Sequence, residues 1–134
     1  MELPTVMKLC ALFIVVVSVS ADSLLGGWSS LDPQDKSAQK ALQYAILKYN
    51  QASNDMYTMK VQKVNGVERQ VVSGLNYRFN VDLVRTTCRN GKELDLDRCP
   101  VHEDANLSKV SSCNFVVNVV PWTGAYTFQK DDCH

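Results

Sequence analysis

The spacing of apolar positions changes along this 134-residue chain. Between residues 38 and 49 apolar side chains recur at steps of three and four, the period of one face of an α-helix. These positions are Ala38, Ala41, Leu42, Ala45, Ile46 and Tyr49. From residue 76 the period falls to two, which is typical of a strand with one buried face. The pattern therefore predicts one amphipathic helix followed by β-structure.

The ends of the helix carry recognisable signals. Asp32 can cap it, Pro33 suits the first helical position, and Asp35 places negative charge in the first turn. The helix should end near the stretch "NQASND" at residues 50–55, because Asn and Asp tolerate turn geometry.

The clearest strand is "NYRFNVDLV", residues 76–84. One face carries Tyr77, Phe79, Val81 and Leu83, and the other carries Asn76, Arg78, Asn80 and Asp82. Residues 56–72 are also rich in β-formers, and "CNFVVNVVPW" and "GAYTFQK" predict two more strands. A polar, irregular insert separates Cys88 from about Lys109. The predicted class is α+β, with one helix packed across an antiparallel sheet.

The residues alone leave the first hairpin turn open between two places. Asn65-Gly66 is the stronger local hairpin signal and would bury Val71 and Val72 in a strand. Alternatively, the strand runs past Asn65-Gly66 with a bulge and turns within "QVVSG", residues 70–74.

The first 21 residues have the layout of a secretory signal peptide. Lys8 precedes nine apolar residues, Leu9 to Val17, and small residues follow up to Ala21. The apolar run is shorter than the about 20 residues that a membrane-spanning helix needs. We expect cleavage after Ala21, a secreted extracellular product, and a single domain over residues 22–134.

Charge and cysteines narrow the function classes. Acidic and basic residues number 14 each, and no basic run exists, so nothing favours binding to nucleic acid or to a membrane. Cys10 would leave with the signal, and the other four cysteines could then form two disulfides in any of three pairings. No CxxC occurs, and His102 and His134 lack zinc-ligand spacing, so we expect neither metal nor cofactor.

Three separated motifs bear a family resemblance. They are "LLGG" at residues 24–27, "QVVSG" at residues 70–74 and Pro121-Trp122. A long predicted helix follows the first motif, and four cysteines lie in the final third of the chain. In this combination the chain resembles the secreted type 2 cystatins. It departs from them at Ser73, where alanine is common, and at Trp28, where many relatives have proline.

The resemblance implies a fold. A five-stranded antiparallel sheet should wrap around one long helix, with disulfides Cys88–Cys99 and Cys113–Cys133. The first turn should lie at residues 70–74, so that Asn65-Gly66 becomes an irregularity inside a long strand. A monomer is expected, although hairpins of this kind also permit domain-swapped dimers.

The resemblance also implies a function. Cystatins are reversible, tight-binding inhibitors of papain-like cysteine proteases such as cathepsins, and they are not enzymes. Three segments would fill the protease cleft. By matching motifs they are Leu24, Leu25 and Gly26 of an N-terminal arm, then Gln70, Val71, Val72, Ser73 and Gly74, and finally Pro121 and Trp122. The alternative is a secreted cystatin-fold protein that no longer inhibits and serves as a binding or antimicrobial module.

Two smaller sites complete the expectations. Some secreted cystatins inhibit legumain through an asparagine after the helix, and Ser53-Asn54-Asp55 stands at the matching place. The competing interpretation is that Asn54 only ends the helix in a left-handed turn. Asn106-Leu107-Ser108 is a glycosylation sequon in a predicted surface loop.

Overall fold

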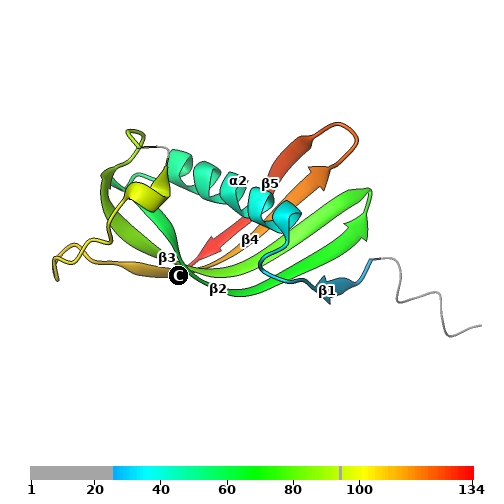
Figure 1. Cartoon of the computed structure of the whole chain (residues 1–134), viewed down its shortest axis with the longest axis horizontal. Coiled ribbons are helices and arrows are strands. Elements are labelled where there is room, and N and C mark those ends of the chain that lie inside the picture. Colours follow the sequence, from blue (N-terminus) through cyan, green and yellow to red (C-terminus); the bar gives the residue numbers. More distant parts are fainter. Residues whose placement is uncertain (1–25, 94) are drawn as a thin grey trace, which may run out of the picture.

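The computed structural model describes residues 26–93 and 95–134, so the predicted signal segment, Leu24 and Leu25 lie outside the described residues. The elements are β1 (Trp28–Ser30), α2 (Lys36–Ala52), β2 (Tyr57–Val72), β3 (Gly74–Arg89), the short 3-10 helix η1 (Leu96–Arg98), β4 (Val110–Val120) and β5 (Ala125–Cys133). All five strands form one antiparallel sheet in the order β1-β2-β3-β4-β5. The sheet curves around α2, which confirms the expected class (Figure 1).

The core lies between the helix and the inner face of the sheet. The four alternating apolar residues of β3 are all buried, and the predicted helix face supplies Ala38, Ala41 and Ala45. Phe115 and Val117 of β4 also belong to the cluster. The small alanines let the helix approach the sheet closely, while the aromatic and branched strand residues fill the layer between them. The alternation predicted from the sequence is therefore confirmed.

The helix begins later than the sequence pattern predicted. Asp35 is its N-cap, and the Asp35 carboxylate accepts a hydrogen bond from the Ala38 amide at 2.9 Å. Asp32 instead accepts from the amide of Gln34 at 2.8 Å and forms the turn before the helix. The assignment of the cap to Asp32 was wrong, because two aspartates three residues apart offer the same local signal. The predicted end is confirmed, since α2 stops at Ala52.

The first hairpin turns at Ser73. β2 runs to Val72 and β3 starts at Gly74, so the turn expected within residues 70–74 is confirmed and the alternative turn at Asn65-Gly66 is wrong. The register instead shifts between Val64 and Gly66, within β2. The side-chain amide of Asn65 on β2 donates a hydrogen bond to the Asp82 carboxylate on β3 at 3.2 Å. Pairing along the whole of β3 therefore overrides the local turn preference of Asn-Gly.

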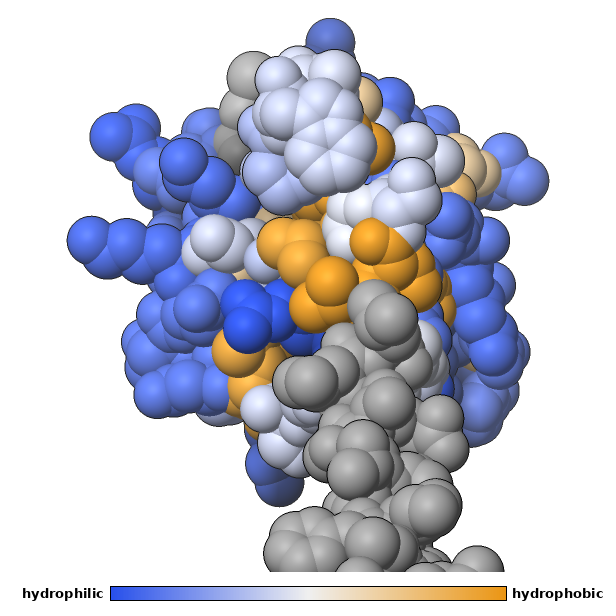
Figure 2. Space-filling view, turned by 90° about the vertical axis from the view of Figure 1, so that its right-hand side faces the viewer, coloured by the Kyte–Doolittle hydropathy of each residue, from blue (hydrophilic) through white to orange (hydrophobic). Residues whose placement is uncertain are grey.

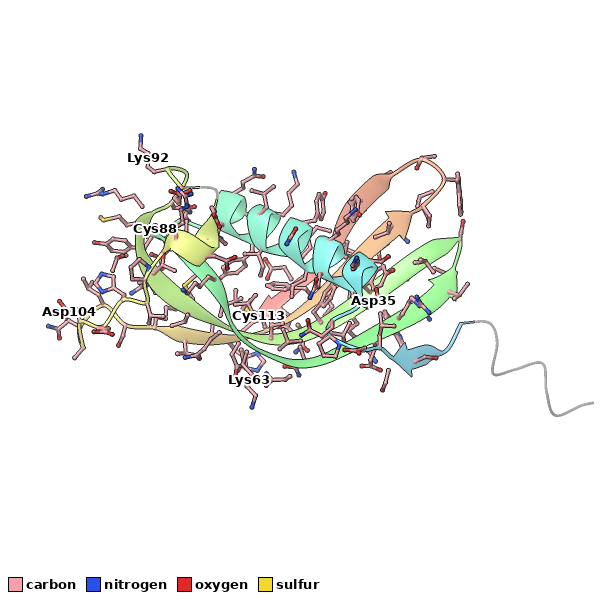
Figure 3. The ribbon with its side chains drawn as sticks, viewed as in Figure 1. Asp35, Lys63, Cys88, Lys92, Asp104 and Cys113 are labelled. Carbon is pink, nitrogen blue, oxygen red and sulfur yellow. A yellow bond between two sulfur atoms is a disulfide. The ribbon has the colours of Figure 1, made fainter. Side chains whose placement is uncertain are left out.

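Both disulfides are pairings of neighbours in the sequence, Cys88–Cys99 and Cys113–Cys133, as expected. Figure 3 shows Cys88 at the end of the molecule that carries the insert and Cys113 beneath the helix. The insert is also held to β3 by backbone hydrogen bonds, among them Thr87 N–H to the Pro100 carbonyl at 2.9 Å. Within residues 26–93 and 95–134, no helix has the length and apolar character to cross a membrane.

Candidate functional site

The tip of the β2–β3 hairpin exposes apolar side chains. Val71 and Val72 are 47% and 40% exposed, and Ser73 lies at the turn itself. Val71 pairs with Leu75, and Val72 pairs with Gly74. Both valines are β-branched and sit in paired strand, so they present a stiff apolar surface to solvent rather than a mobile one. Two adjacent valines at such a tip are therefore not part of the core.

Gly74 is required by the geometry of this turn. Its φ of 101° lies in a region that L side chains rarely adopt. A Cβ at this position would also lie 2.7 Å from the carbonyl oxygen of Val119 in β4. The glycine therefore lets the first hairpin turn and at the same time lie directly against the end of β4.

The β4–β5 hairpin carries the most exposed large apolar side chain among the described residues. Its turn is closed by the Gly124 amide, which donates to the Val120 carbonyl at 2.8 Å, and Gly124 has a φ of 72°. Pro121 and Trp122 occupy the tip, and Trp122 is 72% exposed. Proline fixes the backbone just before the tryptophan, so the ring projects from a defined position.

The base of the N-terminal arm is held beside the first hairpin. β1 pairs with β2 so that Trp28 lies opposite Gln70. The Gln70 side-chain amide donates a hydrogen bond to the carbonyl oxygen of Gly26, which has a φ of 84°. The Arg78 guanidinium stacks on the Trp28 ring at 4.2 Å from its centroid. Arg78 is itself fixed by a two-pronged salt bridge to Glu68, with the shortest N–O distance 2.9 Å.

These three segments lie at the same end of the molecule (Figure 1). Apolar surface gathers on this end between regions of polar surface (Figure 2). A shallow hollow separates the two hairpin tips and is lined by Val71–Leu75 on one side and Pro121 and Trp122 on the other. We call these two tips together with Gly26 the hairpin edge. Of the predicted inhibitory residues, Leu24 and Leu25 lie outside the described residues, and the other eight all belong to this edge.

The predicted legumain loop lies at the opposite end of β2. Asn54 is exposed, and Ser53 and Asp55 are half-buried. The Ser53 hydroxyl accepts from the Asp55 amide at 3.0 Å, and the Asp55 carboxylate binds the Arg85 guanidinium at 2.6 Å. No non-glycine residue of the described part has a positive φ, so the interpretation of Asn54 as a left-handed helix end is wrong.

The charge of Asp55 is stabilised by its contacts. Partial burial would raise the pKa of this carboxyl, but hydrogen bonds from the Tyr57 amide and from Arg85 outweigh burial and hold the pKa below its ordinary value. Asp55 therefore stays ionised at neutral pH and remains paired with Arg85.

The sequon lies in an exposed turn of the insert. Asn106 is exposed, and its amide donates to the Asp104 carboxylate at 2.9 Å. Asp104 lies at the outer tip of the molecule in Figure 3, far from the hairpin edge. The position is open to a modifying enzyme, and glycosylation at Asn106 stays a prediction.

Comparisons with known proteins agree with this architecture. The family model described as "Cystatin domain" matches residues 26–122. Cystatin-2 of Crotalus adamanteus is 38% identical over 110 residues, which cover 82% of this chain and 80% of that protein. Cystatin-C of Homo sapiens is 37% identical over 110 residues, 82% of this chain and 75% of that protein.

Solved structures show the same fold. The crystal structure of dimeric human cystatin F has a TM-score of 0.75 at 28% identity and covers 90% of this chain and 95% of its own. The salivary cystatin of the soft tick Ornithodoros moubata has a TM-score of 0.67 at 27% identity, with 81% of this chain and 97% of its own covered.

A helix held in a five-stranded antiparallel sheet, with two disulfides, is the fold of the solved cystatin structures. Together with the match over residues 26–122, it places this chain in the cystatin family. Cystatins inhibit cysteine proteases and are not enzymes. All four cysteines among the described residues are joined in disulfides, so none of them is a free thiol nucleophile.

Proposed function

We propose that this chain is a reversible, tight-binding inhibitor of papain-like, cathepsin-type cysteine proteases, and that the hairpin edge enters the protease cleft. One observation carries the proposal. Two exposed valines and an exposed tryptophan line one hollow, and Gly26 of the N-terminal arm is hydrogen-bonded to Gln70 beside it. An exposed apolar patch surrounded by polar surface is typical of a protein-binding site.

Each segment has a distinct chemical task. Leu24 and Leu25 supply apolar side chains for the substrate side of the cleft. Gly26, with its positive φ, turns the chain so that no peptide carbonyl is offered to the nucleophile. Val71 and Val72 fill the centre of the cleft, and Trp122 anchors the far side as a large aromatic ring. The inhibitor is thus held by its contacts and is not presented as a substrate.

Magnitudes favour three segments over one. Nanomolar affinity corresponds to about 12 kcal/mol. Burying one aliphatic side chain contributes roughly 1.5–3 kcal/mol, and association costs several kcal/mol or more. No single segment reaches this sum, whereas the two hairpin tips and the N-terminal arm together can do so.

Replacement of Trp122 tests the proposal. Because the ring is 72% exposed, Trp122→Ala should leave the melting temperature nearly unchanged. The inhibition constant for papain should rise roughly 30-fold or more, as expected for an interface anchor worth at least about 2 kcal/mol. Met56→Ala is the matched control, since Met56 is 57% exposed at the opposite end. A loss of stability without a loss of inhibition would contradict the assignment.

A second function is favoured at the opposite end. We infer that Asn54 is a candidate reactive asparagine for legumain, because it is exposed and its neighbours Ser53 and Asp55 are fixed by hydrogen bonds. β2 starts beside this loop and ends at the first hairpin, so the two sites lie far enough apart for both proteases to bind together.

Charge placed on Asn54 separates the two sites. Asn54→Lys should abolish legumain inhibition and change papain inhibition less than about twofold. Gln51→Lys is the control, because it adds the same charge to an exposed position three residues away on the helix. Unchanged legumain inhibition in Asn54→Lys would remove the second function and leave the first intact.

The compartment follows from the same proposal. Two disulfides need an oxidising environment, and the first 21 residues have the layout of a signal peptide. We therefore propose a secreted, extracellular protein. One molecule presents the complete hairpin edge, so a monomer suffices for inhibition.

A further inference from the structure

Three primary amides lie in one row on the outer face of the sheet, beside the hairpin edge. The strand register places Gln70 of β2 opposite Asn76 of β3, and Asn76 opposite Asn118 of β4. Their neighbours Tyr77 and Val117 are fully buried in the core. Because successive strand residues point to opposite faces, the amides share the outer face.

The hydrogen bonds of this row all run in one direction. Asn118 Nδ2 donates to Asn76 Oδ1 at 2.8 Å, and Asn76 Nδ2 donates to Gln70 Oε1 at 3.2 Å. Gln70 Nε2 then donates to the carbonyl oxygen of Gly26. Asn76 and Gln70 each accept at the side-chain oxygen and donate from the side-chain nitrogen, so the bonds polarise one another. The row ends on the backbone of the N-terminal arm.

We propose that Asn76 and Asn118 are positioning residues for protease binding. With Gln70 they hold the Gly26 carbonyl against β2 and so fix the direction in which the arm leaves the sheet. Neither asparagine lines the hollow between the hairpin tips. They act on the protease only through the arm, and this role rests on the proposed inhibitory function.

The physical benefit is pre-organisation. A glycine at the base of an arm leaves the backbone freer than any other residue would. An arm that is ordered only on binding loses part of its interaction energy to that ordering. By fixing the Gly26 carbonyl in the free protein, the amide row removes part of this cost. The row starts at Asn118 of β4, and β4 leads into the turn that carries Trp122. The row therefore also links the arm to the second hairpin.

A double-mutant cycle separates this role from a general structural one. Asn76→Thr keeps a strand-forming residue and removes the amide. With the arm intact, this variant should raise the inhibition constant for papain about three- to tenfold, the factor expected for a lost hydrogen-bond network. Combined with Leu24→Ala and Leu25→Ala, the same change should have less than about a twofold effect. An equal loss in both backgrounds would overturn the proposal.

Asn114 provides the matched control, because it lies on β4 as Asn118 does. Asn114 is four residues from Asn118 and on the same face, but it pairs with Asn80 rather than Asn76. Asn114→Thr should leave inhibition unchanged with either arm. If it matches the effect of Asn76→Thr, the row has no special role.

A measurement on the free protein tests the row without any protease. The backbone 15N resonance of Gly27 reports the hydrogen bond to the Gly26 carbonyl. The side chains of Asn76 and Gln70 lie between Asn118 and Gly26 in the row. Asn118→Thr should nevertheless shift the Gly27 resonance and speed solvent exchange of the Gln70 side-chain amide. Asn114→Thr should do neither. This result would support the row even if the chain inhibited no papain-like protease, and an unchanged Gly27 resonance in Asn118→Thr would overturn it.

Discussion

The two ends of the β2–β3 ribbon are built in different ways. At the hairpin edge, Val71, Val72 and Trp122 are exposed, and the turn is fixed by backbone geometry and close strand contact. At the other end, side chains tie the chain together. A disulfide joins Cys88 to Cys99, and the Lys60 ammonium donates to the Cys99 carbonyl at 2.7 Å.

That other end also anchors the helix. The Asn50 side chain both donates to the Met59 carbonyl and accepts from the Met59 amide, each at 2.9 Å. Such buried, fully paired contacts are worth more than exposed ones. The cross-links and the proposed papain-binding surface therefore lie at different ends of one ribbon. The cross-linked end and the core supply stability, so the hairpin edge can leave apolar side chains in solvent.

The largest effect should come from breaking the geometry of the hairpin edge. Gly74→Ala places a Cβ 2.7 Å from the Val119 carbonyl oxygen at a φ of 101°. Backbone strain of this kind costs about 3 kcal/mol, and the tip must shift to relieve it. We expect a lower melting temperature and a loss of papain inhibition together. Gly66→Ala is the control, since nothing lies within 4 Å of its added Cβ.

Equal behaviour of these two alanine variants would contradict the role given to Gly74. Thermal unfolding followed by circular dichroism, together with the inhibition constant of the same sample, decides the matter.

Breaking the opposite end should lower stability and leave papain inhibition nearly unchanged. Replacing both Cys88 and Cys99 with serine opens a loop with a sequence separation of 11. The chain-entropy model gives a loss of about 3 kcal/mol in the free energy of unfolding. Papain inhibition at 25 °C should change less than about threefold, because the protein stays folded and the hairpin edge lies elsewhere. Chemical denaturation and papain titration measure the two quantities, and a parallel loss of both would mean that the ends are coupled.

A smaller effect should follow from acid. The pKa of Asp55 is lower in the folded protein than its ordinary value of 3.8. The ion pair of Asp55 with Arg85 therefore stabilises the fold when the pH lies above that ordinary pKa. This stabilisation is lost as pH falls further, through the lowered pKa. Asp55→Asn should therefore lower stability by roughly 1 kcal/mol at pH 7. The difference from the unmodified protein should vanish in strong acid.

Comparing Asp55→Asn with the unmodified protein separates the effect of Asp55 from the opposite effect of Asp131 on stability. Burial and the neighbouring Asp132 raise the pKa of Asp131, so Asp131 destabilises the folded state at neutral pH and does so less as pH falls. Because both proteins carry Asp131, its contribution cancels. Melting temperatures of the pair between pH 7 and pH 2 give the test, and a constant difference across that range would exclude the ion pair as its source.

Much of the fold could be predicted from the sequence, and specific residues show why. The alternation from Tyr77 to Leu83 predicts which face of β3 is buried, because a strand has only two faces. The helix cap was misassigned because Asp32 and Asp35 are locally equivalent, and only the path of the chain into α2 distinguishes them.

The site was predicted in part, and mainly through the family motifs. Without them, the local signal at Asn65-Gly66 would have placed the first turn inside β2 and buried the two valines. The amide row of Gln70, Asn76 and Asn118 could not be predicted, because it depends on the register of three strands. Alternation places Asn76 on the outer face but does not say which residues lie opposite.

The central claim is that the hairpin edge closes a papain-like active site. Papain with counted active sites should be titrated with the disulfide-bonded chain of residues 22–134 while hydrolysis of a peptide substrate is followed. Papain activity should fall linearly to near zero at one inhibitor per enzyme and return on dilution. Full activity in the presence of an excess of correctly folded monomer would rule out insertion of the hairpin edge into papain and would mean that the exposed valines and Trp122 serve a different partner.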